Sequence, residues 1–449
     1  MHSLNADCKK APRAFFCAFC KSCYTKDEVI GLRKAYAVGF RRHVKKDSLR
    51  YSLEELKNLA GSLGIDVIRT FTQSSEQITP AYKVGTGKLE EMRALLEEES
   101  IDYVIFDEEL TNTQIRNLEE VLDVAIIDRT LLILETFAKR AKTKEAMLQV
   151  EIAQLKYLKP RLTSMRTSFA QQQGGIGQRG PGEKKLELDR RKIDRDINNL
   201  EHQLKNITRT RKSNRRRRKL SPIKNVAIVG YTNAGKSTLM NALLKQSKHG
   251  PENKSVAVED RLFATLETAT RQIRFKERKP FTLTDTIGFI SKLPHELVES
   301  FKATLEEISE ADLLLHVVDF SHPYYLDQVQ TTEKVLEEIG VEDVETLYVF
   351  NKIDLNNAVL PPNFQPAIKV SLKDGTNLDT LVETINEMLF RDDAVIVYSI
   401  PQDKGEIVHM LNEYAEILDK EYENNTVRIR ARVSKPLRED LRPYELRPE

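Results

Sequence analysis

The sequence predicts a multidomain α/β protein. A chain of 449 residues is too long for one ordinary core, so about three domains are expected. In both halves of the chain, short runs rich in Val, Ile, Tyr and Phe alternate with helix-length segments, which is typical of parallel sheets covered by helices. Between the halves lies a long stretch of helical periodicity without strand signals. We therefore expect an N-terminal α/β subdomain, a long two-helix subdomain, a domain with a doubly wound, mostly parallel sheet, and a small C-terminal α/β domain.

Composition and charge narrow the class of protein. The formal net charge is only +2, but the segment from Lys184 to Lys219 holds fifteen Lys/Arg against five Asp/Glu. Such a block commonly marks a nucleic-acid partner, the alternative being a solvated helix face. No apolar run approaches the ~18 residues of a membrane-spanning helix, and the N-terminus has no signal-peptide pattern. We therefore expect a cytoplasmic protein with no membrane span.

All four cysteines lie near the N-terminus, at Cys8, Cys17, Cys20 and Cys23. Their C-x-x-C-x-x-C spacing is compatible with a metal site. A structural zinc site normally pairs two ligand clusters within an ordered module, and this segment has little apolar periodicity from which to build one. We therefore favour a disordered tail with reduced thiols over residues 1–33.

Residues 34–130 are predicted to form a small α/β domain. Its strand signals are short β-branched and aromatic runs at Ala35–Phe40, Asp66–Gln73, Tyr103–Asp107 and Val124–Asp128. Helical periodicity falls between them at Leu53–Ser62, Lys88–Glu99 and Thr111–Leu122. The sequence of this domain shows no catalytic constellation.

Residues 131–220 are predicted to form a helical hairpin. Apolar residues recur at helical spacing from Leu131 to Leu158, and Pro160 ends the pattern. A second long helix is expected from about residue 183 to about residue 212. Arg215–Lys219, followed by a Ser-Pro pair, is expected to form a basic hinge.

The stretch 171–185 between these helices is rich in glycine and matches G-x-G-x-x-G at Gly175, Gly177 and Gly180. A dinucleotide-binding loop must follow a strand and open a helix in a βαβ unit, whereas this stretch follows a helix. We interpret it as a hairpin tip whose glycines let the backbone approach a crowded RNA surface, the alternative being a flexible connector. The predicted RNA-binding residues of the hairpin region are Gly174, Gly175, Arg179, Lys184, Lys185, Arg215, Arg216, Arg217 and Arg218.

Residues 221–391 are predicted to form the doubly wound domain, and residues 392–449 the small C-terminal α/β domain. In the first, buried strands are expected at Val226–Gly230, Thr282–Asp285, Leu313–Asp319, Thr346–Asn351 and Ile368–Ser371. In the second, we expect a strand, a helix and a strand at Ala394–Ile400, Gly405–Asp419 and Val427–Val433.

A phosphate-binding loop follows the first strand of residues 221–391. The pattern G-x-x-x-x-G-K-[ST] is matched by Gly230, Tyr231, Thr232, Asn233, Ala234, Gly235, Lys236 and Ser237, with Thr238 completing the predicted set. In such a loop, backbone N–H groups and the following helix N-terminus surround the phosphates. Lys236 is expected to reach the β and γ oxygens, and Ser237 to ligate Mg²⁺.

Two further motifs indicate which nucleotide binds. Asp285, Thr286, Ile287 and Gly288 end a strand, so that Asp285 can hold Mg²⁺ through water and the Gly288 N–H can contact the γ-phosphate. A later strand leads into Asn351, Lys352, Ile353 and Asp354. A carboxylate at Asp354 can accept from guanine N1–H and from its 2-amino group, a donor pair that adenine lacks. We therefore expect GTP and GDP as ligands, with the base covered by Ser371, Leu372 and Lys373.

The segment DRLFATLETATR is expected to carry a switch threonine that ligates Mg²⁺ and senses the γ-phosphate. We choose Thr265, with Thr268 and Thr270 as competitors; its predicted neighbours in the site are Phe263, Ala264, Leu266 and Glu267. The predicted catalytic residues are Lys236, Thr265 and Gly288. Many GTPases place a water-orienting glutamine after this glycine, but this chain has Phe289, so the unaided hydrolysis rate should be low.

The motifs GYTNAGKST, LFATL, DTIGFI, NKID and VSLK, preceded by LQVEIAQLKYLKPRL and GGIGQRGPGEKKLELDRRKI, resemble those of the HflX family over residues 34–449. The resemblance implies a two-helix subdomain joined by the glycine-rich loop, a P-loop GTPase domain and a Mg²⁺-dependent, ribosome-stimulated GTP hydrolase. It implies partnership with the large ribosomal subunit and its rRNA, and a role, as a monomer, in dissociating or rescuing idle or stalled ribosomes.

Two alternatives stay open. In one, the chain is an RNA- or ribosome-binding scaffold in which nucleotide is mainly structural and the basic helix pair is the functional part. In the other, ATP drives RNA remodelling, although the N-terminal side has no second phosphate loop.

Overall fold

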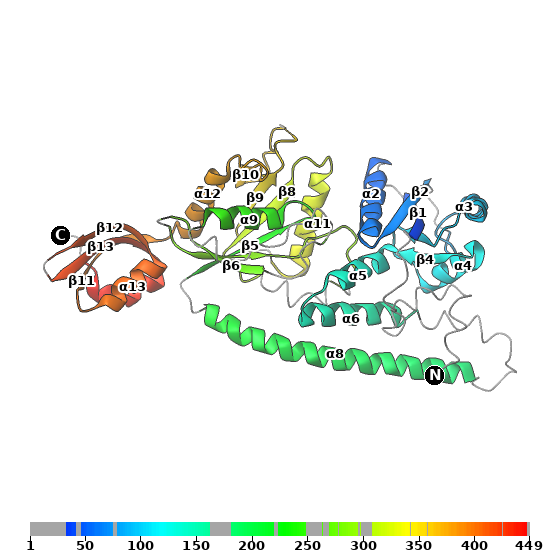
Figure 1. Cartoon of the computed structure of the whole chain (residues 1–449), viewed down its shortest axis with the longest axis horizontal. Helices are drawn as coiled ribbons and strands as arrows, with labels where there is room; N and C mark the ends of the chain where they lie inside the picture. The colour runs from blue at the N-terminus through cyan, green and yellow to red at the C-terminus, as the bar shows by residue number, and fades with distance from the viewer. Residues whose placement is uncertain are drawn as a thin grey trace. The chain divides into compact units, whose positions relative to one another are not determined.

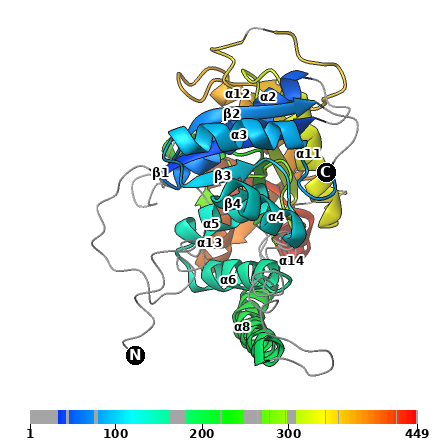
Figure 2. The ribbon, with the colours of Figure 1, turned by 90° about the vertical axis from the view of Figure 1, so that its right-hand side faces the viewer.

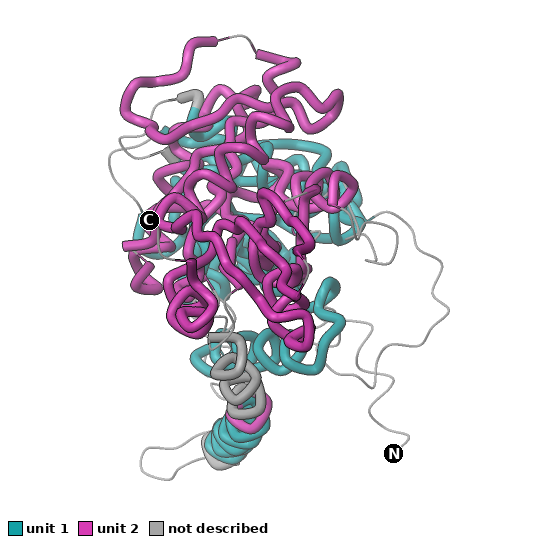
Figure 3. Tube along the Cα trace, turned by 90° about the vertical axis from the view of Figure 1, so that its left-hand side faces the viewer, with its two compact units in different colours: residues 1–204, 292–300 teal, residues 205–291, 301–449 magenta. Residues whose placement is uncertain are grey.

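The computed structural model describes residues 33–41, 46–74, 79–161, 181–219, 223–247, 263, 269–276, 278–294, 297, 308–341, 343–356, 358–423 and 425–446. The chain divides into two compact units, which Figure 3 colours separately. Unit 1 comprises residues 1–204 and 292–300, and unit 2 comprises residues 205–291 and 301–449. The predicted mixed α/β class is confirmed. The finer division into five segments stays a prediction.

A four-stranded parallel sheet with the order β2-β1-β3-β4 forms the centre of unit 1. Its strands are β1 (Arg33–Arg41), β2 (Ile65–Ser74), β3 (Tyr103–Phe106) and β4 (Ala125–Asp128), each close to its predicted bounds. Because the strands are parallel, their carboxyl ends lie at one edge of the sheet. The polar residues Asp107 and Asp128 lie at that edge.

Helices cover this sheet. On one side, α2 (Lys46–Ser62) packs on β1 and β2 and contacts α5 (Arg129–Arg140). There, a Cβ atom on Gly39 would lie 2.9 Å from the side chain of Leu49, so α2 approaches β1 as closely as glycine permits. On the other side, α3 (Thr86–Glu98) and α4 (Asn112–Leu122) contact each other (Figure 2). They enclose a core that includes Tyr36 and Met92.

The helix predicted over Leu131–Leu158 is in fact two helices, α5 and α6 (Lys144–Leu158). Ala141 has an extended conformation with ψ 117°, and the Thr143 side chain accepts a hydrogen bond from Ala146 N at 3.2 Å. Thr143 therefore caps a new helix. Ala141 is buried, so the apolar pattern continues through the break and periodicity alone does not reveal it.

The second helix of the predicted hairpin is α8 (Pro181–Lys219), 39 residues long. Residues 215–219, predicted to begin a basic hinge, continue this helix instead, and the Ser-Pro pair that completes the prediction lies outside the described residues. Near its middle, α8 is tied to the end of α6 by ion pairs of Lys156 with Glu201 (3.1 Å) and of Lys159 with Asp194.

Unit 2 is built on a six-stranded sheet with the order β10-β9-β8-β5-β7-β6. The predicted strands are confirmed as the parallel strands β5 (Lys224–Gly230), β7 (Phe281–Asp285), β8 (Leu313–Asp319), β9 (Thr346–Asn351) and β10 (Ala367–Lys369). The antiparallel edge strand β6 (Ala269–Ile273) was not predicted. Its sequence ATRQI is only partly buried and has no apolar run.

Helices cover both faces of this sheet, as in a doubly wound fold. α9 (Lys236–Gln246) and α12 (Leu378–Phe390) share one apolar core with β5, β7 and β8, while α11 (Tyr325–Glu338) packs in another with Phe320 and Phe350 (Figure 1). The predicted ligand motifs follow the carboxyl ends of β5, β7, β9 and β10.

The C-terminal part of unit 2 is an antiparallel sheet with the order β11-β13-β12, where β11 is Ala394–Pro401, β13 Thr426–Val433 and β12 Glu416–Tyr422. α13 (Gly405–Tyr414), α14 (Lys435–Asp440) and a 3₁₀ turn (Arg442–Tyr444) complete it. The helix predicted over residues 405–419 is too long, because α13 ends at Tyr414 and β12 begins at Glu416. β12 is largely exposed and charged, so its strand character comes from pairing with β13 and from the 3.0 Å ion pair of Glu416 with Arg432.

Candidate nucleotide site

The predicted phosphate loop connects the end of β5 to the start of α9. Gly230 has φ +142°, and a Cβ atom there would lie 2.3 Å from the Val317 carbonyl oxygen. Gly235 has φ +104°, and a Cβ atom there would lie 2.3 Å from Asn351 Nδ2. Both conformation and space therefore require glycine at each end of the loop. The helix α9 begins directly after this loop, so the backbone N–H groups of its N-terminus can bind an anion there.

Lys236 lies at the first turn of α9 and is buried. Its Nζ donates a hydrogen bond to the Tyr231 carbonyl at 2.6 Å, which holds the side chain back over the loop. Burial lowers the pKa of Lys236 to about 8, and the charge of Asp285 opposes this shift. The ammonium therefore stays largely protonated at neutral pH and is available to an anionic ligand.

Ser237 and Asp285 bring two oxygen ligands together beside the loop. The Ser237 hydroxyl donates to Asp285 Oδ2 at 2.7 Å, and Asp285 ends β7, next to Ile228 of β5. Thr286 fixes the same turn by donating from its hydroxyl to the Ile228 carbonyl at 2.6 Å. Mg²⁺ prefers oxygen ligands and commonly takes one or two from the protein, with phosphate oxygens completing its shell. The donor set therefore fits this ion.

The segment after β7 returns along the phosphate loop. Phe289 N donates to the Gly230 carbonyl at 3.2 Å, and Thr232 N donates to the Phe289 carbonyl at 2.8 Å. A Cβ atom on Gly288 would lie 2.8 Å from Lys236 Nζ and 3.0 Å from Thr232 Cα. The loop, the lysine and the backbone of Gly288 are thus in direct contact.

A second set of contacts joins the loop to the predicted base-binding motifs. Asn351 donates from Nδ2 to the Ala234 carbonyl at 2.9 Å and accepts at Oδ1 from Leu372 N at 3.2 Å. The Ser371 hydroxyl donates to Asp354 Oδ1 at 2.9 Å, which orients the carboxylate. These residues follow β9 and β10, which are adjacent parallel strands.

Lys352 stabilises the same corner of the site. Its Nζ contacts Asp319 Oδ2 at 2.6 Å and the Asn233 carbonyl at 3.2 Å. Asp319 ends β8 and was not predicted as part of the site, although its position at the carboxyl end of a buried strand is a signal that the sequence contains. Lys352 therefore works with Asn351 in fixing the phosphate loop to the NKID segment.

Three protein-family models match successive parts of the chain. Residues 50–138 match the GTP-binding GTPase N-terminal family, residues 140–218 the GTP-binding GTPase middle region, and residues 225–352 the 50S ribosome-binding GTPase family. A protein named GTPase HflX from Caldanaerobacter subterraneus is 44% identical over 393 residues, which are 88% of this chain and 90% of that protein. The chain belongs to the HflX family of GTPases.

A second relative agrees with this assignment. The GTPase HflX of Escherichia coli is 37% identical over 361 residues, which are 79% of this chain and 83% of that protein. A crystal structure of a GTP-binding protein from Sulfolobus solfataricus in complex with GDP has 25% identity and a TM-score of 0.42, covering 80% of this chain and 99% of that chain. As an HflX family member with the matching GTPase domain, the chain is a GTP hydrolase.

Part of the predicted site lies outside the described residues. Among the switch residues this applies to Ala264, Thr265, Leu266, Glu267 and Thr268. Phe263 is described and buried. The competitor Thr270 lies in β6, where its hydroxyl is 3.0 Å from the Thr284 hydroxyl. Thr270 is thus engaged in the sheet, whereas Thr265 and its other competitor Thr268 are not described, and the choice of Thr265 stays a prediction.

The predicted RNA-binding residues of this HflX protein are only partly described. Gly174, Gly175 and Arg179 lie outside the described residues, as do the four cysteines. The backbone of Lys184, Lys185 and residues 215–218 belongs to α8, but their side chains are not described. In the part of the chain that is described, no group of three or more His, Cys, Asp or Glu side chains could hold a metal ion. No described helix is long and apolar enough to cross a membrane.

A buried charged cluster in unit 1 was missed by the sequence analysis. It consists of Asp107 after β3, Arg129 at the start of α5 and Glu55 in α2. Arg129 donates to Asp107 Oδ1 at 2.7 Å and also pairs with Glu55. The available signal was a carboxylate directly after a buried strand, the same signal that marks Asp285 and Asp319.

Proposed function

We propose that this HflX-family GTP hydrolase is a Mg²⁺-dependent switch that binds the large ribosomal subunit and dissociates or rescues idle or stalled ribosomes in the cytoplasm. The match of residues 225–352 to the 50S ribosome-binding GTPase family is the main support for this proposal. Curated relatives that align over most of their length with this chain share the name GTPase HflX. In this proposal the GTP-bound state associates with the subunit, and hydrolysis releases it.

The nucleotide roles rest on the contacts described above. The loop from Gly230 to Thr238 binds the phosphates. Asp354, whose carboxylate accepts a hydrogen bond from the Ser371 hydroxyl, binds the guanine edge. Ser237 and Thr265 would hold Mg²⁺, with Asp285 beside Ser237 as a further oxygen donor. The ion would supply positive charge near the phosphates. Lys236 places a second positive charge there.

The described part of the site contains no side chain after Gly288 that could orient the attacking water. Phe289 and Ile290, which follow Gly288, are buried and carry no side-chain hydrogen-bonding group. A water molecule therefore has no orienting side chain at the position where many GTPases have glutamine. We propose that hydrolysis is slow in the isolated protein and that the ribosome supplies or positions the missing group.

The basic segment of α8 and the glycine-rich stretch 171–185 are proposed to contact rRNA. Contacts of Lys and Arg with phosphate weaken as salt rises, because binding releases counterions. The helix α8 is anchored to α6 by two ion pairs, so its orientation on unit 1 is fixed over residues 194–201. The basic residues toward the ends of α8 are therefore the ones to test for contact with rRNA.

Cosedimentation with purified large ribosomal subunits tests this function. Binding should be strong with a non-hydrolysable GTP analogue and weak with GDP. Neutralising Arg215–Arg218 to Gln should lower the slope of log affinity against log salt. A matched control neutralises four exposed basic residues of the C-terminal region, Lys404, Arg428, Arg430 and Lys435. Equal binding in both nucleotide states would favour the scaffold alternative over the switch.

A further inference from the structure

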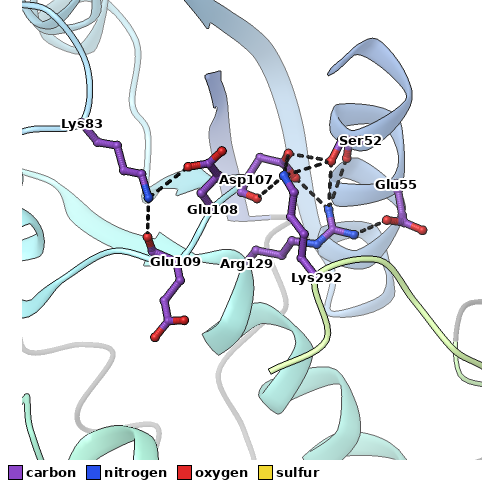
Figure 4. Close-up of polar contacts among 8 residues, drawn as sticks. All are labelled: Ser52, Glu55, Lys83, Asp107, Glu108, Glu109, Arg129 and Lys292. Atoms are coloured by element: carbon purple, nitrogen blue, oxygen red, sulfur yellow. Dashed lines mark hydrogen bonds and ion pairs between the residues drawn. The ribbon is translucent and has the colours of Figure 1, made fainter. Parts of the chain in front are cut away.

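The side-chain hydroxyl of Thr232 is buried in the phosphate loop and has no hydrogen-bond partner among the described residues. The residue is only 7% exposed. A buried polar group without a partner has lost its hydrogen bonds to water, so nearly all such groups in folded proteins are paired. In unit 1, for example, the Ser52 hydroxyl donates to Asp107 Oδ2 at 2.6 Å (Figure 4). The Thr232 hydroxyl is therefore available to a ligand that binds in the loop.

Thr232 lies where the phosphate loop meets the segment after β7. Its backbone N–H donates to the Phe289 carbonyl at 2.8 Å, and a Cβ atom on Gly288 would lie 3.0 Å from Thr232 Cγ2. The methyl group thus lies against Gly288, and the hydroxyl is attached to the same carbon atom as this methyl group. Gly288 is the residue whose N–H is proposed to contact the γ-phosphate. The hydroxyl is therefore close to the position proposed for the reacting phosphate.

Two neighbouring hydroxyl groups already have partners in the protein. The Tyr231 hydroxyl accepts a hydrogen bond from Ser291 N at 2.7 Å. The Thr286 hydroxyl donates to the Ile228 carbonyl at 2.6 Å. Both groups hold backbone segments in place. Thr232, by contrast, can offer a ligand both its O–H donor and the lone pairs of its oxygen.

We propose that Thr232 is a catalytic residue whose hydroxyl orients the attacking water in GTP hydrolysis. The water donates a hydrogen bond to Thr232 Oγ1, which directs a lone pair of the water oxygen toward the γ-phosphorus. The water oxygen bonds to this phosphorus, and the bond from the phosphorus to the β–γ bridging oxygen breaks, giving GDP and inorganic phosphate. Both hydrogens of the water end on the inorganic phosphate, because a threonine hydroxyl is too weak a base to keep a proton.

Thr232 serves the slow hydrolysis of the isolated protein. A glutamine amide donates and accepts through separate atoms, whereas a hydroxyl must do both through one oxygen. The rate that Thr232 supports is therefore expected to be low. Its role depends on the GTP hydrolase activity and on the proposed position of the phosphates, and not on the ribosome.

Two substitutions of Thr232 test this role in the full chain. Thr232→Val keeps the methyl group against Gly288 and removes the hydroxyl, whereas Thr232→Ser keeps the hydroxyl. Single-turnover release of inorganic phosphate measures the hydrolysis rate of bound GTP, and titration with a fluorescent, non-hydrolysable GTP analogue measures affinity. In Thr232→Val the rate should fall about tenfold or more, while the affinity for the analogue stays within about twofold. Thr232→Ser should keep most of the rate.

A control variant and a stability measurement separate catalysis from folding. Thr332→Val is the matched control, because the Thr332 hydroxyl is likewise buried but donates to the Gln328 carbonyl at 3.0 Å within α11. It should leave the hydrolysis rate unchanged. The free energy of unfolding of the nucleotide-free protein should not fall in Thr232→Val, because the hydroxyl that is removed has no partner there.

An unchanged rate in Thr232→Val, or an equal loss of rate in Thr232→Ser, would overturn the proposed role. A loss of analogue affinity as large as the loss of rate would overturn it as well, because the hydroxyl would then act in binding alone. The measurements use no ribosomes. Failure of ribosome stimulation would therefore refute the proposed function and leave this result standing.

Discussion

The side-chain amide of Asn351 donates a hydrogen bond to the Ala234 carbonyl at 2.9 Å and accepts one from the Leu372 amide at 3.2 Å. One buried side chain thus joins the phosphate loop, the NKID segment and the segment after β10. Ala234 lies 117 residues before Asn351 in the sequence, and Leu372 lies 21 residues after it. Their relative position in the site depends on an asparagine that is not itself assigned to phosphate or metal.

Asn351→Ala should weaken GTP and GDP binding alike. The change leaves the Ala234 carbonyl and the Leu372 amide without these bonds, at a cost of about 1–3 kcal/mol per buried group, so nucleotide affinity should fall at least roughly fivefold. Titration with fluorescent nucleotides measures the loss. Asn356→Ala is the control, because Asn356 likewise donates to a carbonyl, that of Phe320, at 2.7 Å. Normal nucleotide affinity in Asn351→Ala would contradict the predicted role.

Asp354→Asn should change which base is bound. The Ser371 hydroxyl can still donate to the side-chain oxygen, so the geometry is kept. The NH₂ group that replaces Oδ2 cannot accept from guanine but can donate to the 2-oxo group of xanthine. GTP affinity should fall by roughly a hundredfold or more, and xanthosine triphosphate should bind better than GTP. Retained preference for GTP would show that another group reads the base.

Arg129→Met should destabilise unit 1 strongly. It leaves Glu55 and Asp107, both buried, without the guanidinium between them. Removing one partner of a buried ion pair costs about 3–5 kcal/mol of unfolding free energy. Chemical denaturation measures the loss, with Arg69→Met as control, because the pair of Arg69 with Glu99 is exposed and should contribute little to stability. Similar losses in the two variants would argue against a special role for the cluster.

Glu119 should make the stability of unit 1 depend on pH. Burial raises the pKa of Glu119 to about 7, and the hydrogen bond from Ile126 N opposes this only in part. The folded state therefore binds the proton more tightly than the unfolded state between the ordinary carboxyl pKa and about 7. Unfolding free energy falls as pH rises through this window. Glu119→Gln should remove the slope and add roughly 1–2 kcal/mol at pH 8. Denaturation at pH 5 and pH 8 checks both, and an unchanged slope would refute it.

Strands and ligand motifs could be predicted because their signals are local. A buried strand such as β5 or β8 is a continuous apolar run, and Gly230–Ser237 combines such a strand with a helix start. The break at Ala141 and the strand β12 could not be predicted in this way. In both places the local pattern continues a helix, and the outcome depends on a cap at Thr143 or on pairing with β13.

The contacts that position the site were the least accessible to sequence analysis. Nothing in NKID indicates that Asn351 reaches Ala234, or that the partner of Lys352 is Asp319, 33 residues away. Such pairs depend on which strands are neighbours in the sheets. The sequence signals a carboxylate at the end of a strand, and the tertiary structure decides which cation reaches it.

The rate of GTP hydrolysis with and without purified large ribosomal subunits tests the central claim most directly. The buried Phe289 and Ile290 provide no side chain that orients water, so turnover should be slow in the protein alone and should rise many-fold with the subunits. The rise should saturate with subunit concentration and be lost in Asp354→Asn at the same GTP concentration. A rate that is unchanged by the large subunit would contradict the account.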